Sequence, residues 1–117
     1  FMAEELKRNG GKTWVYQFNR VRDDELAQKY GAFHGAELPY VFDTHDQWLP
    51  TNKADKVLTE EIQSYWLSFA KTGDPNNDGA VVWPEYESSN DSTLVLDNEI
   101  YQRSHESSEI CKIMDLF

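Results

Sequence analysis

The spacing of apolar residues predicts a chain in which helices surround one strand and one hairpin. Residues 1–9 carry apolar side chains four apart and end in Asn9-Gly10-Gly11, which is typical of a helix end. Residues 13–19 then alternate aromatic residues with others around Val15, as a β-strand does. A helix, a Gly-Gly turn and a strand in that order indicate an α/β fold.

A short helix is the next regular element that the pattern predicts. Residues 20–30 are rich in charge, and we expect them to form an exposed connection. Over residues 37–42, Leu38, Val41 and Phe42 would share one face of a helix. Pro39 (in the same stretch) suits the first turn of a helix, where its missing N–H is not needed.

The clearest helix follows a polar stretch and spans residues 57–72. Its apolar residues recur at helical spacing and form one wide stripe: Ile62, Tyr65, Trp66, Phe69 and Ala70. Thr59 is the predicted N-cap, and a start near Asp55 is the alternative. Gly73 and Pro75 predict where the helix ends.

The last third of the chain is predicted to contain a long loop, a hairpin and a helix. Residues 74–92 form the loop. Two short apolar stretches, residues 93–96 and 99–102, flank Asp97-Asn98, which is a two-residue hairpin signal. Residues 109–117 place their apolar side chains on one helical face.

The strand at residues 13–19 has no evident partner in this pattern. Its backbone groups need hydrogen bonds, so we expect it to join a sheet supplied by other sequence or to pair with a second copy. An exposed aromatic strand promotes association. The isolated chain is therefore predicted to self-associate through residues 13–19.

Composition narrows the function classes. The 117 residues suit one domain, and the net charge of −10 argues against a nucleic-acid surface. No apolar run approaches the roughly 20 residues of a membrane span. The N-terminus lacks the basic and apolar regions of a signal peptide, so we expect none in this chain. Cys111 is the single cysteine, which excludes an internal disulfide and a Cys-rich metal site.

His34 is the strongest candidate for chemistry, because it lies between Gly31 and Gly35 in an otherwise apolar run. Histidine is the most frequent general base, although a lone histidine is also often structural. Catalysis requires a nucleophile within reach and an acid to orient the ring. The chain contains no Gly-x-Ser-x-Gly elbow, so His34 is a candidate base without a nucleophile to activate.

Two patterns invite a metal interpretation. Residues 74–85 fit the calcium-loop pattern, but Trp83-Pro84 stands where the second helix of such a site should run. His45 lies near two aspartates without a second His or Cys at ligand spacing, so we expect a solvated loop. His105 is given no role. We predict neither a metal nor a cofactor.

Several stretches together resemble one family. Residues 31–42, GAFHGAELPYVF, closely resemble the segment around the catalytic histidine of type B carboxylesterases, the family of cholinesterases and bacterial para-nitrobenzyl esterases. Residues 65–76, YWLSFAKTGDPN, resemble the family's late helix and its stop. Residues 83–86, WPEY, resemble its next anchor, and residues 14–18 resemble the strand before the histidine loop.

The resemblance implies an α/β-hydrolase fold, of which residues 1–117 form the C-terminal segment of a single catalytic domain. His34 would be the triad histidine, and the serine, the acid and the oxyanion hole would lie upstream. Glu37 matches a glutamate of the family for which a supporting role is expected, as it is for Gly35. The substrate would be a small carboxylic ester.

Two rivals to the esterase hypothesis stay open at this point. A cholinesterase-like adhesion or interaction domain would keep the fold without the chemistry, and a calcium-binding module would use residues 74–85. The esterase hypothesis predicts that the isolated chain is inactive, because a triad histidine without its serine has nothing to deprotonate.

Overall fold

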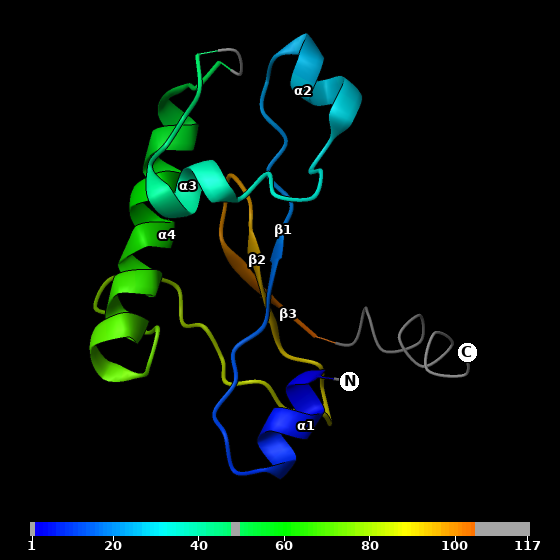
Figure 1. The fold of residues 1–117 in the computed structure, drawn as a ribbon, viewed down its shortest axis with the longest axis vertical. Coiled ribbons are helices and arrows are strands. Elements are labelled where there is room, and N and C mark those ends of the chain that lie inside the picture. The colour runs from blue at the N-terminus through cyan, green and yellow to red at the C-terminus, as the bar shows by residue number, and fades with distance from the viewer. Residues whose placement is uncertain (1, 48–49, 105–117) are drawn as a thin grey trace.

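The computed structural model describes residues 2–47 and 50–104, which form helices and a small sheet (Figure 1). The elements, in chain order, are α1 (Met2–Arg8), β1 (Tyr16–Phe18), α2 (Glu25–Tyr30), α3 (Leu38–Phe42), α4 (Lys53–Thr72), β2 (Thr93–Leu96) and β3 (Tyr101–Arg103). The predicted helix over residues 109–117, with Cys111, lies outside the described residues, as does His105.

The sheet has the order β1-β2-β3, so a strand from the N-terminal part of the chain pairs with strands from the C-terminal part. β1 runs parallel to β2, with Phe18 opposite Leu96, and β2 runs antiparallel to β3. The expectation that the strand at residues 13–19 lacks a partner within this chain is wrong. A parallel pair needs a long crossover, and here α2, α3 and α4 form it.

The core lies between the sheet, α3 and α4. All four residues of β2 are buried, which suits the central strand of the sheet. α4 lies along one side of the molecule and α3 crosses it (Figure 1). The buried apolar cluster draws on α3, α4, the following loop and β2: Tyr40, Leu58, Ile62, Tyr65, Trp83, Leu94 and Leu96.

The long helix begins earlier than its apolar stripe indicates. α4 starts at Lys53 with Asn52 as N-cap, so the predicted start at residue 57 with Thr59 as N-cap is wrong, and the alternative near Asp55 was closer. Asn52 and Asp55 form a capping box, in which each side chain accepts the other's backbone N–H. The predicted end at Gly73 is confirmed, with φ of 77°.

The short helix is confirmed, but its buried face is different. Leu38 and Phe42 are 50% and 66% exposed, whereas Tyr40 is 1% exposed. Tyr40 faces inward because its ring packs on Phe18, with 5.1 Å between ring centroids, and its hydroxyl reaches Asp55. The most buried residue of α3 is therefore Tyr40, and not Leu38 or Phe42 of the face that the apolar spacing predicts.

The charged connection is neither irregular nor fully exposed. Residues 25–30 form α2, and the Asp24 side chain accepts the Ala27 N–H at its start. Arg20 and Arg22 are only 3% and 4% exposed. The expectation of an exposed connection over residues 20–30 is therefore wrong for Arg20 and Arg22, because both guanidinium groups have partners in the interior.

The hairpin is confirmed in outline. β2 and β3 pair, but residues 97–100 separate them, so the predicted two-residue turn is too short. The loop over residues 74–92 contains no helix or strand, as predicted. Within the described residues, no helix has both the length and the apolar character that crossing a membrane demands.

Trp83, in the loop over residues 74–92, contacts both α4 and the segment that leads into β1, and these contacts give a first prediction. Its indole Nε1 donates to the Val15 carbonyl at 3.0 Å, and its ring meets those of Tyr65 and Trp66 at centroid distances of 5.6 Å. Trp83→Ala should lower the free energy of unfolding by about 3–5 kcal/mol, because it leaves a cavity.

Urea denaturation measures this loss. The neighbouring Val82 is 61% exposed, so Val82→Ala should change the free energy of unfolding by less than about 0.5 kcal/mol. Equal losses in the two variants would contradict the role given to Trp83.

Candidate functional site: the histidine turn and the buried polar cluster beneath it

The loop between α2 and α3 contains His34, and this loop lies at the end of the sheet toward which β1 leads (Figure 1). Gly31 caps α2 with a positive φ of 64°, which glycine adopts without strain. Residues 34–37 form a turn that leads directly into α3. The His34 side chain belongs to an exposed residue, so its imidazole is accessible.

The backbone of this turn is closely hydrogen-bonded. Ala36 N donates to Phe33 O at 3.0 Å, and Leu38 N donates to Gly35 O at 3.2 Å. Gly35 has φ of 84°, so a larger residue there would strain the turn. The supporting role predicted for Gly35 thus has a backbone basis, although its bearing on catalysis stays a prediction.

Glu37 links the turn to α3 through its carbonyl group. This oxygen accepts the N–H groups of Tyr40 and Val41 at 2.9 and 3.0 Å. Glu37 is the N-cap of α3, but its carboxylate makes no capping hydrogen bond. The role predicted for its side chain stays a prediction.

The imidazole of His34 has no hydrogen-bonding partner in the part of the chain that the structure describes. No described serine or carboxylate is brought onto its ring to form a triad. Within the described residues, the arrangement therefore offers an exposed imidazole on a well-defined turn, and its role as a base stays a prediction.

A cluster of buried polar groups lies beneath this turn, centred on Asp55 of α4. The side chain of Asp55 is fully buried. Its Oδ1 accepts hydrogen bonds from Arg20 Nε and from the Tyr40 hydroxyl, both at 2.8 Å, and its Oδ2 accepts the Asn52 N–H at 2.9 Å. One carboxylate thus connects the segment after β1, the α3 helix and the start of α4.

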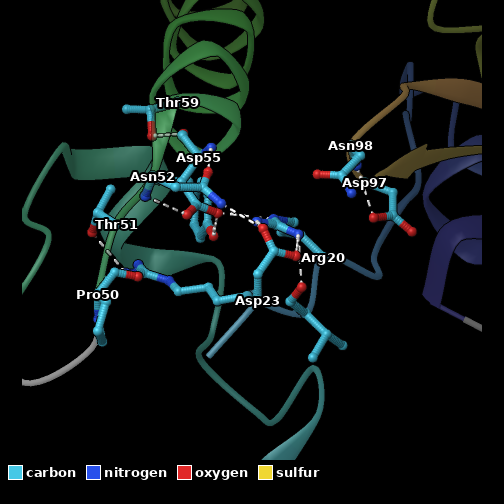
Figure 2. Close-up of polar contacts among 12 residues, drawn as sticks. Arg20, Asp23, Pro50, Thr51, Asn52, Asp55, Thr59, Asp97 and Asn98 are labelled. Atoms are coloured by element: carbon cyan, nitrogen blue, oxygen red, sulfur yellow. Dashed lines mark hydrogen bonds and ion pairs between the residues drawn. The ribbon is translucent and has the colours of Figure 1, made fainter. Parts of the chain in front are cut away.

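The charges in this cluster are balanced. Figure 2 shows Arg20 directed at Asp55 and Asp23, with Asn52 beside Asp55. Burial raises the pKa of Asp55, but hydrogen bonds from Arg20, Asn52 and Tyr40 more than offset this, so the pKa lies below its usual value. Burial, with the same carboxylate beside it, raises the pKa of Tyr40 to about 12.

His45 is part of the same cluster, so the expectation that it lies in a solvated loop is wrong. Its side chain is 4% exposed. Arg22 Nη2 lies 2.8 Å from its Nδ1, and the Thr59 hydroxyl oxygen lies 2.8 Å from its Nε2. Thr59 donates its own proton to the Asp55 carbonyl, so it accepts from Nε2–H, and Nδ1 accepts from Arg22.

This arrangement holds His45 in its neutral form. Burial lowers the pKa of His45, and the positive charge of Arg22 lowers it further. Arg22 also donates to the Thr51 hydroxyl at 2.8 Å and lies 5.2 Å from the centre of the Tyr40 ring. His45 therefore acts in the packing of the loop and not as an exposed titrating group.

The side chains of the calcium-like pattern have other partners. Asp74 Oδ1 accepts the Asn76 N–H at 2.9 Å, Asn76 Oδ1 accepts the Trp83 N–H at 2.7 Å, and Glu85 pairs with Lys7 at 3.3 Å. Among the described residues, no three His, Cys, Asp or Glu side chains gather as a metal ion requires. The pattern builds a turn after α4 and fixes the loop.

Sequence reasoning singled out His34, whose catalytic role stays a prediction, but it missed the polar cluster next to its loop. The spacing of Asn52 and Asp55 is a capping-box signal and could have located the start of α4. The burial of Arg20, Arg22 and Tyr40 had no local signal, because their partners are distant in the sequence.

Two parallel strands, β1 and β2, are joined through helices, and the loop with the candidate base lies beyond the end of the sheet. This arrangement defines an α/β protein, a class in which ligands bind at the carboxyl ends of the strands. Residues 1–113 match the model of the Carboxylesterase family, and the chain belongs to this family. Solved relatives show that its fold is part of an α/β-hydrolase. A para-nitrobenzyl esterase structure superimposes with a TM-score of 0.74 at 34% identity, covering 92% of this chain and 21% of that chain.

Curated relatives are esterases of greater length. Para-nitrobenzyl esterase of Bacillus subtilis is 40% identical over 101 residues, which is 82% of this chain and 20% of that protein. Acetylcholinesterase 1 of Caenorhabditis elegans is 35% identical over 95 residues, 74% of this chain and 15% of that protein. The chain therefore spans a fifth or less of the length of these two relatives.

The depressed pKa of His45 predicts how stability depends on pH. Its ordinary value is 6.5, so below pH 6.5 the unfolded chain binds a proton that the folded chain resists. The free energy of unfolding should fall as the pH drops from 7 to 5. Asp55 does not contribute in this window, because its pKa lies below 3.8 in the folded state.

Urea titrations at pH 7, 6 and 5 measure this dependence. His45→Gln removes the titrating ring, so the free energy of unfolding of this variant should change less over the same range. A pH dependence identical to that of the unsubstituted chain would contradict the buried neutral state of His45.

Proposed function

We propose that residues 1–117 are the C-terminal segment of a single α/β-hydrolase catalytic domain, and that the complete protein hydrolyses small carboxylic esters. The observation that carries the proposal is the accessible imidazole of His34 on a fixed turn, in a chain that belongs to the Carboxylesterase family. The resemblance of residues 31–42 to the family's histidine segment supports the same role.

His34 is proposed to be the general base and acid of the reaction. Its ring takes the proton of a serine hydroxyl as the serine oxygen attacks the ester carbonyl, and it returns that proton to the leaving alcohol. Water then attacks the acyl-enzyme by the same proton transfers and releases the carboxylic acid. The serine, the acid that orients the ring and the oxyanion hole are contributed by sequence outside this chain.

The two rival functions lack a supporting observation. No described feature favours a non-catalytic interaction domain over an esterase, and the calcium-like residues are engaged in the turn after α4. The decisive property is whether activity depends on His34.

The first test of the function replaces His34 in the complete polypeptide that contains this chain. His34→Ala should lower kcat for a para-nitrophenyl ester by at least about 10³-fold, because removing a triad residue leaves only the catalysis from binding and the oxyanion hole. The isolated chain of 117 residues should show no turnover.

Glu60→Ala serves as the control, because Glu60 is an exposed residue on α4. Its kcat should equal that of the unsubstituted protein. Turnover that survives His34→Ala would contradict the proposed role of His34, and a complete polypeptide without any turnover would favour the interaction domain.

We further propose that the isolated chain self-associates through its first strand. β1 pairs with β2 along one edge only, because it ends the order of the described sheet, and Tyr16 on it is 37% exposed. An open aromatic edge can pair with a second copy. Only one edge of β1 is open to a second copy, because β2 already pairs with the other edge.

Light scattering of the isolated chain should therefore give a mass above that of one copy. Tyr16→Lys should reduce this mass, because a charge at an edge strand opposes pairing. Tyr101→Lys, on the opposite edge strand β3, is the matched control, since Tyr101 is 44% exposed. A monomer at all concentrations would overturn the proposal.

A further inference from the structure

Tyr40 is the residue through which the histidine turn is connected to the rest of the fold. It lies in α3, only 1% exposed, six positions after His34. The hydrogen bonds from Leu38 N to Gly35 O and from Tyr40 N to Glu37 O make the turn and α3 one continuous unit. Any rotation of α3 about its axis therefore moves the backbone of His34.

Hydrogen bonds of the imidazole do not fix the position of the turn, because the His34 ring has no hydrogen-bonding partner among the described residues. A small cavity brings the loop and the polar cluster together, because its lining includes residues of both: Phe18, Arg20, Arg22, Gly31, Phe33 and Tyr40. The loop that contains His34 therefore lies next to three members of the polar cluster, Arg20, Arg22 and Tyr40.

The Tyr40 ring is confined by three neighbours. Phe18 of β1 and the ring of His45 have centroids 5.1 and 5.0 Å from it, and the Arg22 guanidinium lies 5.2 Å from its centre. These contacts restrict the tilt of the ring. The hydroxyl also orients the side chain, because it donates a directional hydrogen bond to Asp55 Oδ1 at 2.8 Å.

Asp55 is a suitable fixed point for that hydroxyl. Its carboxylate is held by Arg20 Nε at 2.8 Å and by the Asn52 N–H at 2.9 Å. It also lies in the first turn of α4, the longest helix described, so its position is set independently of α3. Phenylalanine would fill the same space as Tyr40, so packing alone does not require the hydroxyl.

We propose that Tyr40 is a positioning residue for His34, and that its hydrogen bond to Asp55 fixes the rotation of α3 and with it the placement of the imidazole. This inference rests on the proposed role of His34 in ester hydrolysis. Catalysis is sensitive to such placement, since an error of about 1 Å in a reacting group can cost about 100-fold in rate.

The test compares two buried tyrosines in the complete polypeptide that contains this chain. Tyr40→Phe removes the hydroxyl that reaches Asp55. Tyr65→Phe is the matched control, because Tyr65 is equally buried in the same core and its hydroxyl donates to the Val81 carbonyl, away from the turn. Both variants lose one buried hydrogen bond, so both melting temperatures should fall by similar amounts.

The kinetic constants separate positioning from stability. With kcat calculated on folded protein, Tyr40→Phe should lower kcat for a para-nitrophenyl ester about 10- to 100-fold with KM nearly unchanged. Tyr65→Phe should leave both constants within about twofold, since it touches no part of the turn. Equal kcat values for the two variants would overturn the inference.

A second variant keeps the inference testable if Tyr40→Phe folds poorly. Asp55→Glu retains the charge but moves the carboxylate by one methylene, so it should lower kcat in the same direction. The double variant Tyr40→Phe with Asp55→Glu should lose no more in kcat than the larger single loss, because each single change already disrupts the Tyr40–Asp55 hydrogen bond. Losses that multiply would overturn the link between the two residues.

His34→Ala in the same series distinguishes this inference from the proposed function. If that variant is inactive while Tyr40→Phe behaves like Tyr65→Phe, the function stands and the inference fails. If His34→Ala stays active, both fail, because Tyr40 would then have no catalytic group to position.

Discussion

The carboxylate of Asp55 is the group on which the arrangement of the described chain depends. A buried charge is tolerated only when it is paired and fully hydrogen-bonded, and this one receives Arg20, Tyr40 and the Asn52 backbone within 2.9 Å. Each of these donors comes from a different segment, namely the connection after β1, the α3 helix and the N-cap of α4. The requirement that one charge be satisfied therefore determines how three segments meet. An apolar contact of the same size would tolerate many more relative orientations, because dispersion has no preferred direction.

The two described histidines, His45 and His34, differ in burial, and the buried one again has hydrogen-bonding partners for its polar atoms. His45 is enclosed between Arg22 and Thr59, and burial beside a cation keeps it neutral and packs its ring against Tyr40. His34 lies in the loop between α2 and α3 and is exposed. The polar cluster is satisfied by groups within the described residues, whereas the His34 ring has no hydrogen-bonding partner among them. A well-defined turn is thus present in a chain that spans a fifth or less of the length of its two curated relatives.

The sequence predicted those features that depend on neighbours along the chain. The end of α4 at Gly73, the existence of α3 and the hairpin outline follow from local propensities, and all three are confirmed. The rotation of α3, the burial of Arg20 and the partner of β1 were missed. Each depends on a contact between residues that lie far apart in the chain, and neither periodicity nor capping signals report such contacts. Apolar spacing even indicated the wrong face of α3, because the buried residue is Tyr40, whose ring packs on Phe18 and whose hydroxyl donates to Asp55.

The position of His34 was inferred by a different route, through the resemblance of residues 31–42 to a family segment, and its environment shows why the local pattern alone was ambiguous. Flanking glycines shape a turn whether or not the residue between them is catalytic, and here they do so through φ angles of 64° and 84° at Gly31 and Gly35. A structural histidine would be expected to resemble His45, with both ring nitrogens engaged in the interior. The described contacts give His34 the opposite character, since the backbone around it is fixed while its ring is free of partners from the described residues. Such a combination suits a group whose partners belong to another part of the protein.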